Sequence, residues 1–187
     1  MTARYCPSCG GPLVRRRPPG DERERQVCTA CGRIHYENPK IVVGSVSRLG
    51  ERILLCRRAI EPAAGKWTIP AGFLELGESA EQGAQREAFE EARARITLLG
   101  LIAVYSIPQI GQVQLMYLAD LLSPELEAGP ESLEVALFAP HEIPWGELAF
   151  PTVHRVLTRS LELARKPAPL VPVLETLAAA DAEDGAV

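Results

Sequence analysis

The sequence lacks a long uninterrupted apolar run, and none approaches the roughly 20 residues that a membrane-spanning helix requires. It also lacks an excess of basic residues, since 20 lysines and arginines stand against 24 aspartates and glutamates, a net charge of −4. That balance gives no reason to expect general binding to nucleic acids or anionic membranes. Residues 1–6 carry no apolar signal-peptide core. We therefore expect a cytoplasmic protein with no membrane partner, and we disfavour nucleic acid as a partner.

Cysteine is also sparse, but four of the five cysteines form two close pairs, Cys6 with Cys9 and Cys28 with Cys31. Two Cys-x-x-Cys pairs separated by 18 residues favour tetrahedral zinc over disulfides in a cytoplasmic chain. A site closed by four sulfur ligands is structural, and zinc would supply folding energy to a segment with few large apolar residues. A redox-active dithiol is the alternative. Nucleic-acid binding, suggested by the basic run at 15–17, is less favoured.

The composition divides the chain into three segments. Residues 1–38 hold the cysteine pairs, residues 39–166 hold periodic apolar stretches, and residues 167–187 form a tail rich in proline and alanine. The alternation of apolar residues predicts strands, and a 3.6-residue period predicts a helix over about 152–166. The predicted strands are 41–46, 52–56, 98–104, 112–118 and 135–139. We expect the tail to be mobile or loosely docked.

The clearest helix begins after Ser79, which forms a capping box with Gln82, and it is predicted to run to about residue 95. Residues three and four apart share a helix face, so Glu87 lies beside both Glu90 and Glu91. Like charges at this spacing repel, and a cation would neutralise them. Hard carboxylate oxygens suit Mg²⁺ or Mn²⁺. An acidic triplet alone is more often a solvated helix face than a metal site. The choice between these two interpretations therefore depends on the neighbouring residues.

Those neighbours resemble the signature of the Nudix hydrolase family. The signature is Gly, five residues, Glu, seven residues, Arg-Glu-apolar-any-Glu-Glu, then any-Gly-apolar. The chain has Gly72, Glu78 and the run Arg86-Glu87-Ala88-Phe89-Glu90-Glu91 at those spacings. The lead-in Trp67-Thr-Ile-Pro-Ala-Gly72 is also similar, and the resemblance covers about residues 41–160. It implies an α/β fold, specifically an α/β/α sandwich around a mixed sheet. It also implies that the protein is a metal-dependent hydrolase.

The resemblance also implies the ligands of a catalytic Mg²⁺ or Mn²⁺. Glu87 and Glu91 would be the principal ligands. Glu90 would be a further ligand or would position the attacking water. The backbone carbonyl of Ala71 would complete the metal site.

Other residues take their roles from the same resemblance. Arg86 would hold the glutamates in place and pair with Glu78. Some members of the family use a later loop glutamate as the general base, and Glu131 and Glu134 are the candidates. We assign Glu134 to catalysis and Glu131 to substrate binding. Aromatic residues are scarce (5%), and Tyr105, beside the loop expected to set specificity, is the best candidate to stack on a base.

The one departure from the signature is Arg93, where the family has glycine. That glycine suits a left-handed helix end, a conformation that costs a non-glycine residue roughly 1–2 kcal/mol. Because Ala92, Ala94 and Arg95 are good helix formers, we predict that the helix runs on for another turn. The substitution removes no ligand, so activity should survive.

A zinc ribbon ahead of such a domain resembles the layout of NADH pyrophosphatases, but residues 105–113 do not match the Ser-Gln-Pro-Trp-Pro-Phe-Pro-like segment of those enzymes. Other stretches look like Nudix proteins that act on FAD and ADP-ribose: 37–44, 56–60, 107–112, 129–134 and 142–144. This implies a small dinucleotide substrate, either FAD split into FMN and AMP, or ADP-ribose split into AMP and ribose 5-phosphate. NADH and diadenosine polyphosphates are the alternatives.

An alternative hypothesis, from a different functional class, is that the protein is a regulatory module. It would sense such a nucleotide and use the ribbon to contact nucleic acid or a partner. Sensors in this family often have degraded glutamates. Here Glu78, Glu87, Glu90 and Glu91 are all intact, which favours the enzyme. Related enzymes often dimerise, so a homodimer is expected by resemblance only.

Overall fold

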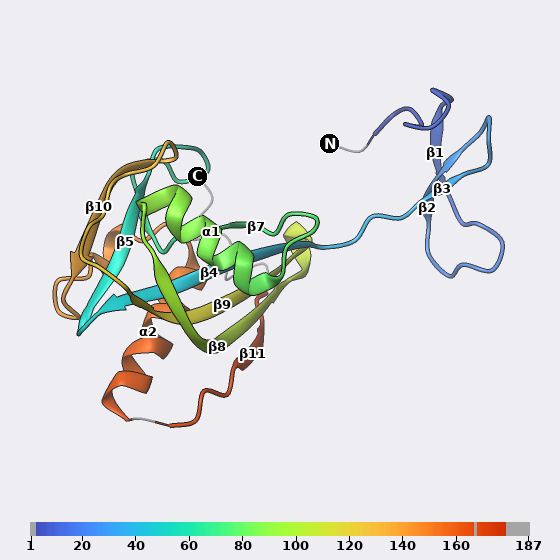
Figure 1. Cartoon of the computed structure of the whole chain (residues 1–187). Coiled ribbons are helices and arrows are strands. Elements are labelled where there is room, and N and C mark those ends of the chain that lie inside the picture. Colours follow the sequence, from blue (N-terminus) through green and yellow to red (C-terminus); the bar gives the residue numbers. More distant parts are fainter. Residues whose placement is uncertain (1–2, 167, 179–187) are drawn as a thin grey trace. The chain divides into compact units, whose positions relative to one another are not determined.

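The chain divides into two compact units, residues 1–38 and residues 39–187 (Figure 1). The computed structural model describes residues 3–166 and 168–178. None of the helices in this part of the chain is long and apolar enough to cross a membrane.

The N-terminal unit is a three-stranded antiparallel sheet made of β1 (Leu13–Arg16), β2 (Arg25–Cys28) and β3 (Ile34–His35), in that order. Each cysteine pair occupies a tight turn, in which a glycine amide donates a hydrogen bond back to the first cysteine carbonyl. Gly10 bonds to Cys6 at 2.8 Å, and Gly32 bonds to Cys28 at 3.0 Å. Val27 is the only large apolar side chain buried among the described residues of this unit. The sequence-based view that this segment has little apolar core is therefore confirmed.

In the described part of the larger unit, a mixed sheet of eight strands packs with two helices. The strands are β4 (Lys40–Leu49), β5 (Arg52–Arg58), β6 (Trp67–Thr68), β7 (Ala71–Phe73), β8 (Ile96–Ile107), β9 (Gln112–Leu121), β10 (Ser132–Phe138) and β11 (Val173–Thr176). The helices are α1 (Ala80–Ala92) and α2 (Pro151–Arg165), with short 3₁₀ turns at Pro108–Ile110 and Trp145–Glu147. The sheet order is β10-β5-β4-β9-β8-β11, with β6 beside β5 and β7 beside β4. Two pairings are parallel, β4 with β9 and β8 with β11.

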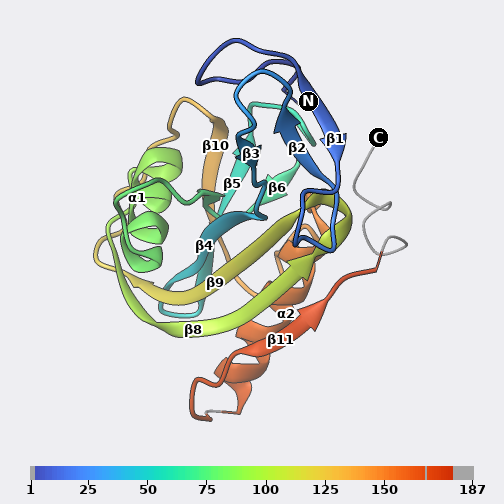
Figure 2. The same cartoon turned by 90° about the vertical axis from the view of Figure 1, so that its right-hand side faces the viewer.

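The alternation of side chains along β5 divides the core into two layers. Leu54 and Cys56 pack in a cluster with Ala88 and Ala92 of α1. On the other face, Ile53 and Leu55 pack with residues of α2: Val153, Val156, Leu157 and Leu163. The two helices therefore cover opposite faces of the sheet, as Figure 2 shows. This arrangement confirms the expected α/β/α sandwich around a mixed sheet.

Four of the five predicted strands fall within β4, β5, β8 and β9. The fifth, 135–139, runs one residue past the end of β10, and the predicted second helix is α2. The expectation of a mobile or loosely docked tail is wrong for residues 173–176, because they form β11 and pair with residues 103–106 of β8. The end of that predicted tail, residues 179–187, lies outside the described residues.

The predicted continuation of α1 past Arg93 is also wrong. The Ser79–Gln82 capping box is present at the start of the helix, but the helix ends at Ala92. Arg93 takes the left-handed conformation, with φ 52° and ψ 18°, and its amide donates to the carbonyl of Phe89 at 2.9 Å. The chain thus keeps the helix end that the signature glycine would make, although a non-glycine residue occupies it.

Replacing Arg93 with glycine is expected to raise the free energy of unfolding by about 1 kcal/mol, because glycine adopts this conformation without steric cost. The Arg93–Phe89 cation–π contact, at 5.3 Å, is lost and offsets part of the gain. Urea denaturation followed by tryptophan fluorescence measures the change. The matched control is Arg95→Gly, at a position without positive φ, which should not gain stability. A less stable R93G protein would show that Arg93 is not strained.

Candidate functional site

Arg86 ties the carboxylates of α1 to the loop that precedes the helix. Its guanidinium donates hydrogen bonds to both oxygens of Glu78, at 2.8 and 3.0 Å, and to the carbonyl of Phe73, at 3.0 Å. It also donates to Glu87 at 2.7 Å and to Glu90 at 2.8 Å. Hydrogen bonding from Arg86 lowers the pKa of Glu78 to about 2. The structure therefore places these motif residues in a single charged network.

Glu87 lies against the backbone of Gly72. A Cβ atom added at Gly72 would overlap the Glu87 carboxylate, at a separation that real Cβ atoms do not show. Glycine is thus needed here for close approach. Glu87 is buried, with 8% of its surface exposed, and burial raises the pKa of its carboxyl group despite the opposing hydrogen bond from Arg86. The glycine of the motif and Glu87, the glutamate that follows Arg86, therefore lie in direct contact.

Glu91 is one turn further along the same face of α1, and it is 7% exposed. Burial raises the pKa of Glu91 to about 8, with a further contribution from the charge of Glu87. The charge of Arg58 and the backbone of Ala71 act in the opposite direction. The Oε2 atom of Glu91 is buried and has no hydrogen-bond partner within the described residues. A buried carboxylate with an unpartnered oxygen, beside a second carboxylate, is a fitting ligand for a cation.

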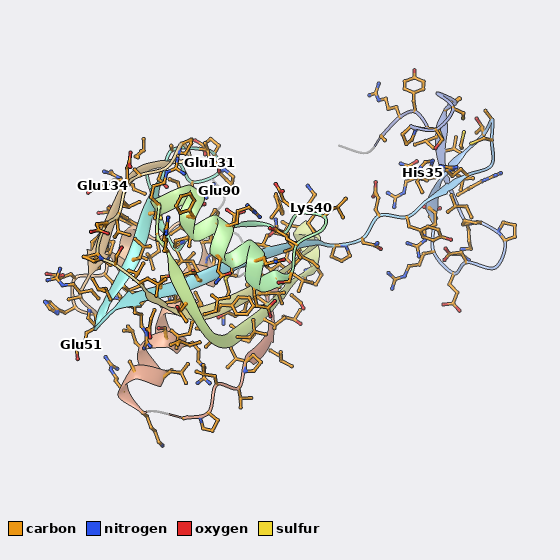
Figure 3. All side chains as sticks on the ribbon, in the orientation of Figure 1. His35, Lys40, Glu51, Glu90, Glu131 and Glu134 are labelled. Atoms are coloured by element: carbon orange, nitrogen blue, oxygen red, sulfur yellow. The ribbon has the colours of Figure 1, made fainter. Side chains whose placement is uncertain are left out.

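The structure distinguishes the two candidate loop glutamates. Burial is the largest cause that raises the pKa of both Glu87 and Glu91, and the charge of Glu131 is a smaller cause in the same direction. Glu131 therefore lies near both carboxylates. Figure 3 shows Glu131 and Glu90 at the same end of α1. Glu134 pairs instead with Arg57, across a 3.7 Å ion pair.

Strand geometry explains why Glu134 is remote from the glutamates of α1. Its neighbour Val135 pairs with Cys56 and packs in the cluster that contains α1. Adjacent residues of a strand point to opposite faces, so Glu134 faces the other side of the sheet. In this structure Glu134 therefore lies away from the glutamates of α1, and Glu131 is the better-placed candidate for the catalytic glutamate.

Tyr105, the candidate for base stacking, lies away from the glutamates of α1 as well. Tyr105 is fully buried in the cluster that packs against α2, on the opposite face of the sheet from α1. Its ring therefore presents no exposed surface to a base. Ala71, in contrast, adjoins Gly72 in β7, and its backbone lies near Glu91.

The carboxylates suit a hard divalent cation because they offer oxygen ligands and because Glu91 Oε2 has no hydrogen-bond partner within the described residues. Glu87, Glu90 and Glu91 do not converge as a ready-made metal cluster among the described residues, since Arg86 holds Glu87 and Glu90. Mg²⁺ does not need such a cage, because it commonly takes one or two carboxylates together with water and substrate phosphates. We therefore regard Glu87 and Glu91 as residues that could hold the cation, with Glu90 next to them.

The four paired cysteines form a second candidate metal centre, in the N-terminal unit. Their Sγ atoms all lie within 4.8 Å of one another. The Cys31 amide donates to Cys28 Sγ at 3.4 Å. This contact is the main cause that lowers the pKa of Cys28, to about 6. Four sulfur atoms with a favoured thiolate among them suit a tetrahedral structural metal.

The fold and the two centres define an α/β/α sandwich with a carboxylate site that suits a divalent cation, together with a separate cysteine-rich unit. Comparison with protein families agrees with this class. Residues 4–37 match a family model described as Nudix N-terminal, and residues 38–161 match the NUDIX domain model. The chain belongs to the Nudix family of pyrophosphohydrolases and carries the N-terminal zinc ribbon found in part of that family.

Individual relatives match most of the larger unit, residues 39–187, which is the catalytic unit. An ADP-ribose pyrophosphatase from Methanocaldococcus jannaschii is 30% identical over 119 residues, which are 62% of this chain and 69% of the relative. The NAD-capped RNA hydrolase NudC from Edwardsiella ictaluri is 32% identical over 135 residues, 71% of this chain and 50% of the relative. The chain thus spans about half the length of that hydrolase. A solved NUDIX hydrolase from Nitrosomonas europaea is 44% identical, with a TM-score of 0.89 over 94% of this chain and 100% of that one.

The raised pKa of Glu91 predicts how stability depends on pH when no divalent cation is added. The folded-state pKa of about 8 exceeds the ordinary value of 4.5, so the folded state retains a proton that the unfolded state loses. This contribution to stability is fully present below about pH 4.5 and is lost as the pH rises through about 8.

The test compares urea midpoints at pH 5 and pH 8 for the parent, Glu91→Gln and Glu90→Gln. Tryptophan fluorescence reports on the catalytic unit, because Trp67 and Trp145 both lie in it. The parent and Glu90→Gln should lose stability at the higher pH, whereas Glu91→Gln should lose less. An equal loss in all three proteins would exclude Glu91 as the titrating group.

Proposed function

We propose that the protein hydrolyses the diphosphate bond of a small nucleotide derivative, most favourably ADP-ribose or FAD, with Mg²⁺ or Mn²⁺. The observation that carries the proposal is the pair of buried carboxylates, Glu87 and Glu91, on one face of α1, one with an unpartnered oxygen. Water adds to one phosphorus and the bridging P–O bond breaks. ADP-ribose would yield AMP and ribose 5-phosphate, and FAD would yield FMN and AMP.

The residues of the site have separate tasks in this reaction. Glu87 and Glu91 would hold the cation. When bound, such a cation neutralises phosphate charge and makes water a better nucleophile. Arg86 fixes Glu87 and Glu90 through hydrogen bonds and is itself anchored by Glu78. Glu131, beside the pair, would accept the proton of the attacking water or position it.

The choice of substrate is supported by two separate likenesses. The likeness to an ADP-ribose pyrophosphatase, of which the chain covers 69%, favours ADP-ribose. FAD is supported by the sequence motifs outside the signature. The likeness to NudC hydrolases and the ribbon ahead of the domain make NAD or NADH the second candidate. A homodimer and a cytoplasmic location remain predictions.

A substrate panel tests the proposal. ADP-ribose, FAD, NADH, NAD and a diadenosine polyphosphate are each incubated with the protein and Mg²⁺ or Mn²⁺, and the products are separated by chromatography. We expect AMP from ADP-ribose or FAD, with turnover lowered at least about 100-fold in Glu87→Gln and Glu91→Gln. Turnover of NADH alone would move the substrate to the second candidate. Nucleotide binding without turnover of any compound would instead favour the sensor.

The same assay separates the two loop glutamates. Glu131→Gln is expected to lower kcat by about 100-fold, the usual scale of a general base. Glu134→Gln is the matched control and should keep kcat within about 2-fold, because Glu134 lies on the other face of the sheet. A larger loss in Glu134→Gln than in Glu131→Gln would reverse the assignment.

We further propose that Cys6, Cys9, Cys28 and Cys31 hold one structural Zn²⁺. The purified chain should contain about one equivalent of zinc, and Cys6→Ser should lose most of it, because a four-sulfur site has no spare ligand. Cys56→Ser, which changes the cysteine outside the cluster, should keep it. Metal analysis gives the zinc content, and hydrogen exchange should show residues 4–37 losing protection in Cys6→Ser. Full zinc content in Cys6→Ser would exclude this ligand set.

A further inference from the structure

Arg86, the arginine of the carboxylate site, has no donor left for a phosphate. A guanidinium group carries five N–H donors. All five donors of Arg86 are used within the protein, twice by Glu78 and once each by Glu87, Glu90 and the carbonyl of Phe73. A diphosphate that approaches these glutamates would therefore gain no hydrogen bond from Arg86 unless one of the existing contacts broke.

A second arginine, Arg58, ends β5 next to the loop that carries Glu131. The amide of the following residue, Ala59, donates to the carbonyl of Glu131 at 2.8 Å. The Gly129 amide of the same loop donates to the carbonyl of Glu91 at 2.9 Å. Backbone hydrogen bonds thus join the end of β5 and the end of α1 to one loop, and Arg58 lies where they meet.

Strand alternation places the Arg58 side chain on the face of the sheet that carries α1. Leu54 and Cys56 lie four and two residues before it in β5, and both pack in the cluster that contains Ala88 of α1. Arg58 therefore points to the same side. The electrostatics agree with this placement: burial is the largest cause that raises the pKa of Glu91, and the charge of Arg58 acts against it.

The protein holds the Arg58 guanidinium without neutralising it. Its Nε atom donates to the carbonyl of Pro62 at 2.9 Å, and its central carbon lies 5.2 Å from the centre of the Phe150 ring. Within the described residues its two terminal nitrogens form no hydrogen bond and no ion pair, whereas the neighbouring Arg57 pairs with Glu134 at 3.7 Å. Two terminal nitrogens in one plane match two oxygens of a phosphate group.

We propose that Arg58 binds the diphosphate of the substrate, its two terminal nitrogens donating to phosphate oxygens. This contact offsets the negative charge that the glutamates of α1 and Glu131 present to an anionic substrate. The inference rests on the proposed function, since it takes a diphosphate as the group that binds here. ADP-ribose, FAD and NADH share that diphosphate, so Arg58 recognises what they have in common and does not choose among them.

Binding of the methylene analogue of ADP, in which carbon replaces the bridging oxygen, tests the proposal without relying on turnover. Calorimetry with Mg²⁺ compares this analogue with adenosine, which has no phosphate, on the zinc-loaded full chain. Arg58→Gln should weaken binding of the analogue about 10- to 100-fold, the scale of a hydrogen bond to a charged group, and leave adenosine binding within about 2-fold. Arg58→Lys keeps the charge without the planar fork and should lose less than Arg58→Gln.

Arg57→Gln is the matched control. Arg57 also holds the loop after β5, since its Nε atom donates to the Gly65 carbonyl at 2.9 Å, but its side chain lies on the other face of the sheet. This variant should bind the methylene analogue within about 2-fold of the parent, because the diphosphate contact is left intact.

The outcomes separate this proposal from the proposed function. Suppose that the parent binds the analogue more tightly than adenosine. Unchanged affinity for the analogue in Arg58→Gln would then overturn the role of Arg58 alone. Equal weakening for both ligands, or equal weakening in Arg58→Gln and Arg57→Gln, would also overturn it, since the shape of the loop would then matter. A parent that binds the analogue no more tightly than adenosine would overturn both proposals.

Arginine labelling of the parent protein covers the case in which the Arg58 variants do not fold. Phenylglyoxal reacts with accessible guanidinium groups, and mass spectrometry of the digested chain distinguishes Arg57 from Arg58. The methylene analogue should slow the labelling of Arg58, whereas adenosine should not, and Arg57 should react at the same rate with either ligand. Labelling of Arg58 at an unchanged rate in the presence of saturating analogue would overturn the proposal.

Discussion

The catalytic unit depends on the burial of two like-charged carboxylates, Glu87 and Glu91, on one face of a helix. Two such groups repel each other, and the interior screens that repulsion far less than water does. Arg86 supplies one positive charge, which it shares among Glu78, Glu87 and Glu90. The remaining negative charge requires a proton or a cation. A proton is favoured when no cation is bound, as the raised pKa of Glu91, about 8, indicates. A bound cation would neutralise the charge in its place.

The sheet makes this burial possible by presenting polar backbone and small side chains to α1 at one place. Strand β7 presents Gly72, where Glu87 occupies the space that a side chain would fill. Strand β5 brings Leu54 and Cys56 to the same helix. The opposite face of β5 packs against α2, which leaves the face toward α1 free to carry chemistry. The site is therefore a property of the sandwich as a whole, and α1 alone would leave the glutamates in water.

The parts that the sequence predicted well are those with strong local signals. The capping box at Ser79 and Gln82, the long alternating strands and the spacing of Arg86 to Glu91 are all local, and the structure has them. The errors have a different origin. Strand β11 is short and is held by pairing with β8, which no local period reveals. The burial of Tyr105 and the placement of Glu134 depend on which face of the sheet each residue occupies, and a β-bulge between Ser132 and Glu134 shifts that register.

The end of α1 shows how a single backbone conformation links the helix to the loop that precedes β10 and carries Glu131. Because Arg93 turns left-handed, the carbonyls of Glu91 and Ala92 are free of helix partners. The Glu91 carbonyl accepts instead from the amide of Gly129, at 2.9 Å, and the Ala92 carbonyl accepts from the amide of Glu127, at 3.0 Å. A Cβ atom at Gly129 would overlap the Glu90 carbonyl, so glycine lets the loop lie on the helix end. Glu131 follows two residues later, and the Ala59 amide holds its carbonyl at 2.8 Å. A helix that continued past Arg93 would occupy these carbonyls itself and deprive the loop of its anchor. The strain at Arg93 is therefore tolerated because the same turn brings Glu131 to the two buried glutamates.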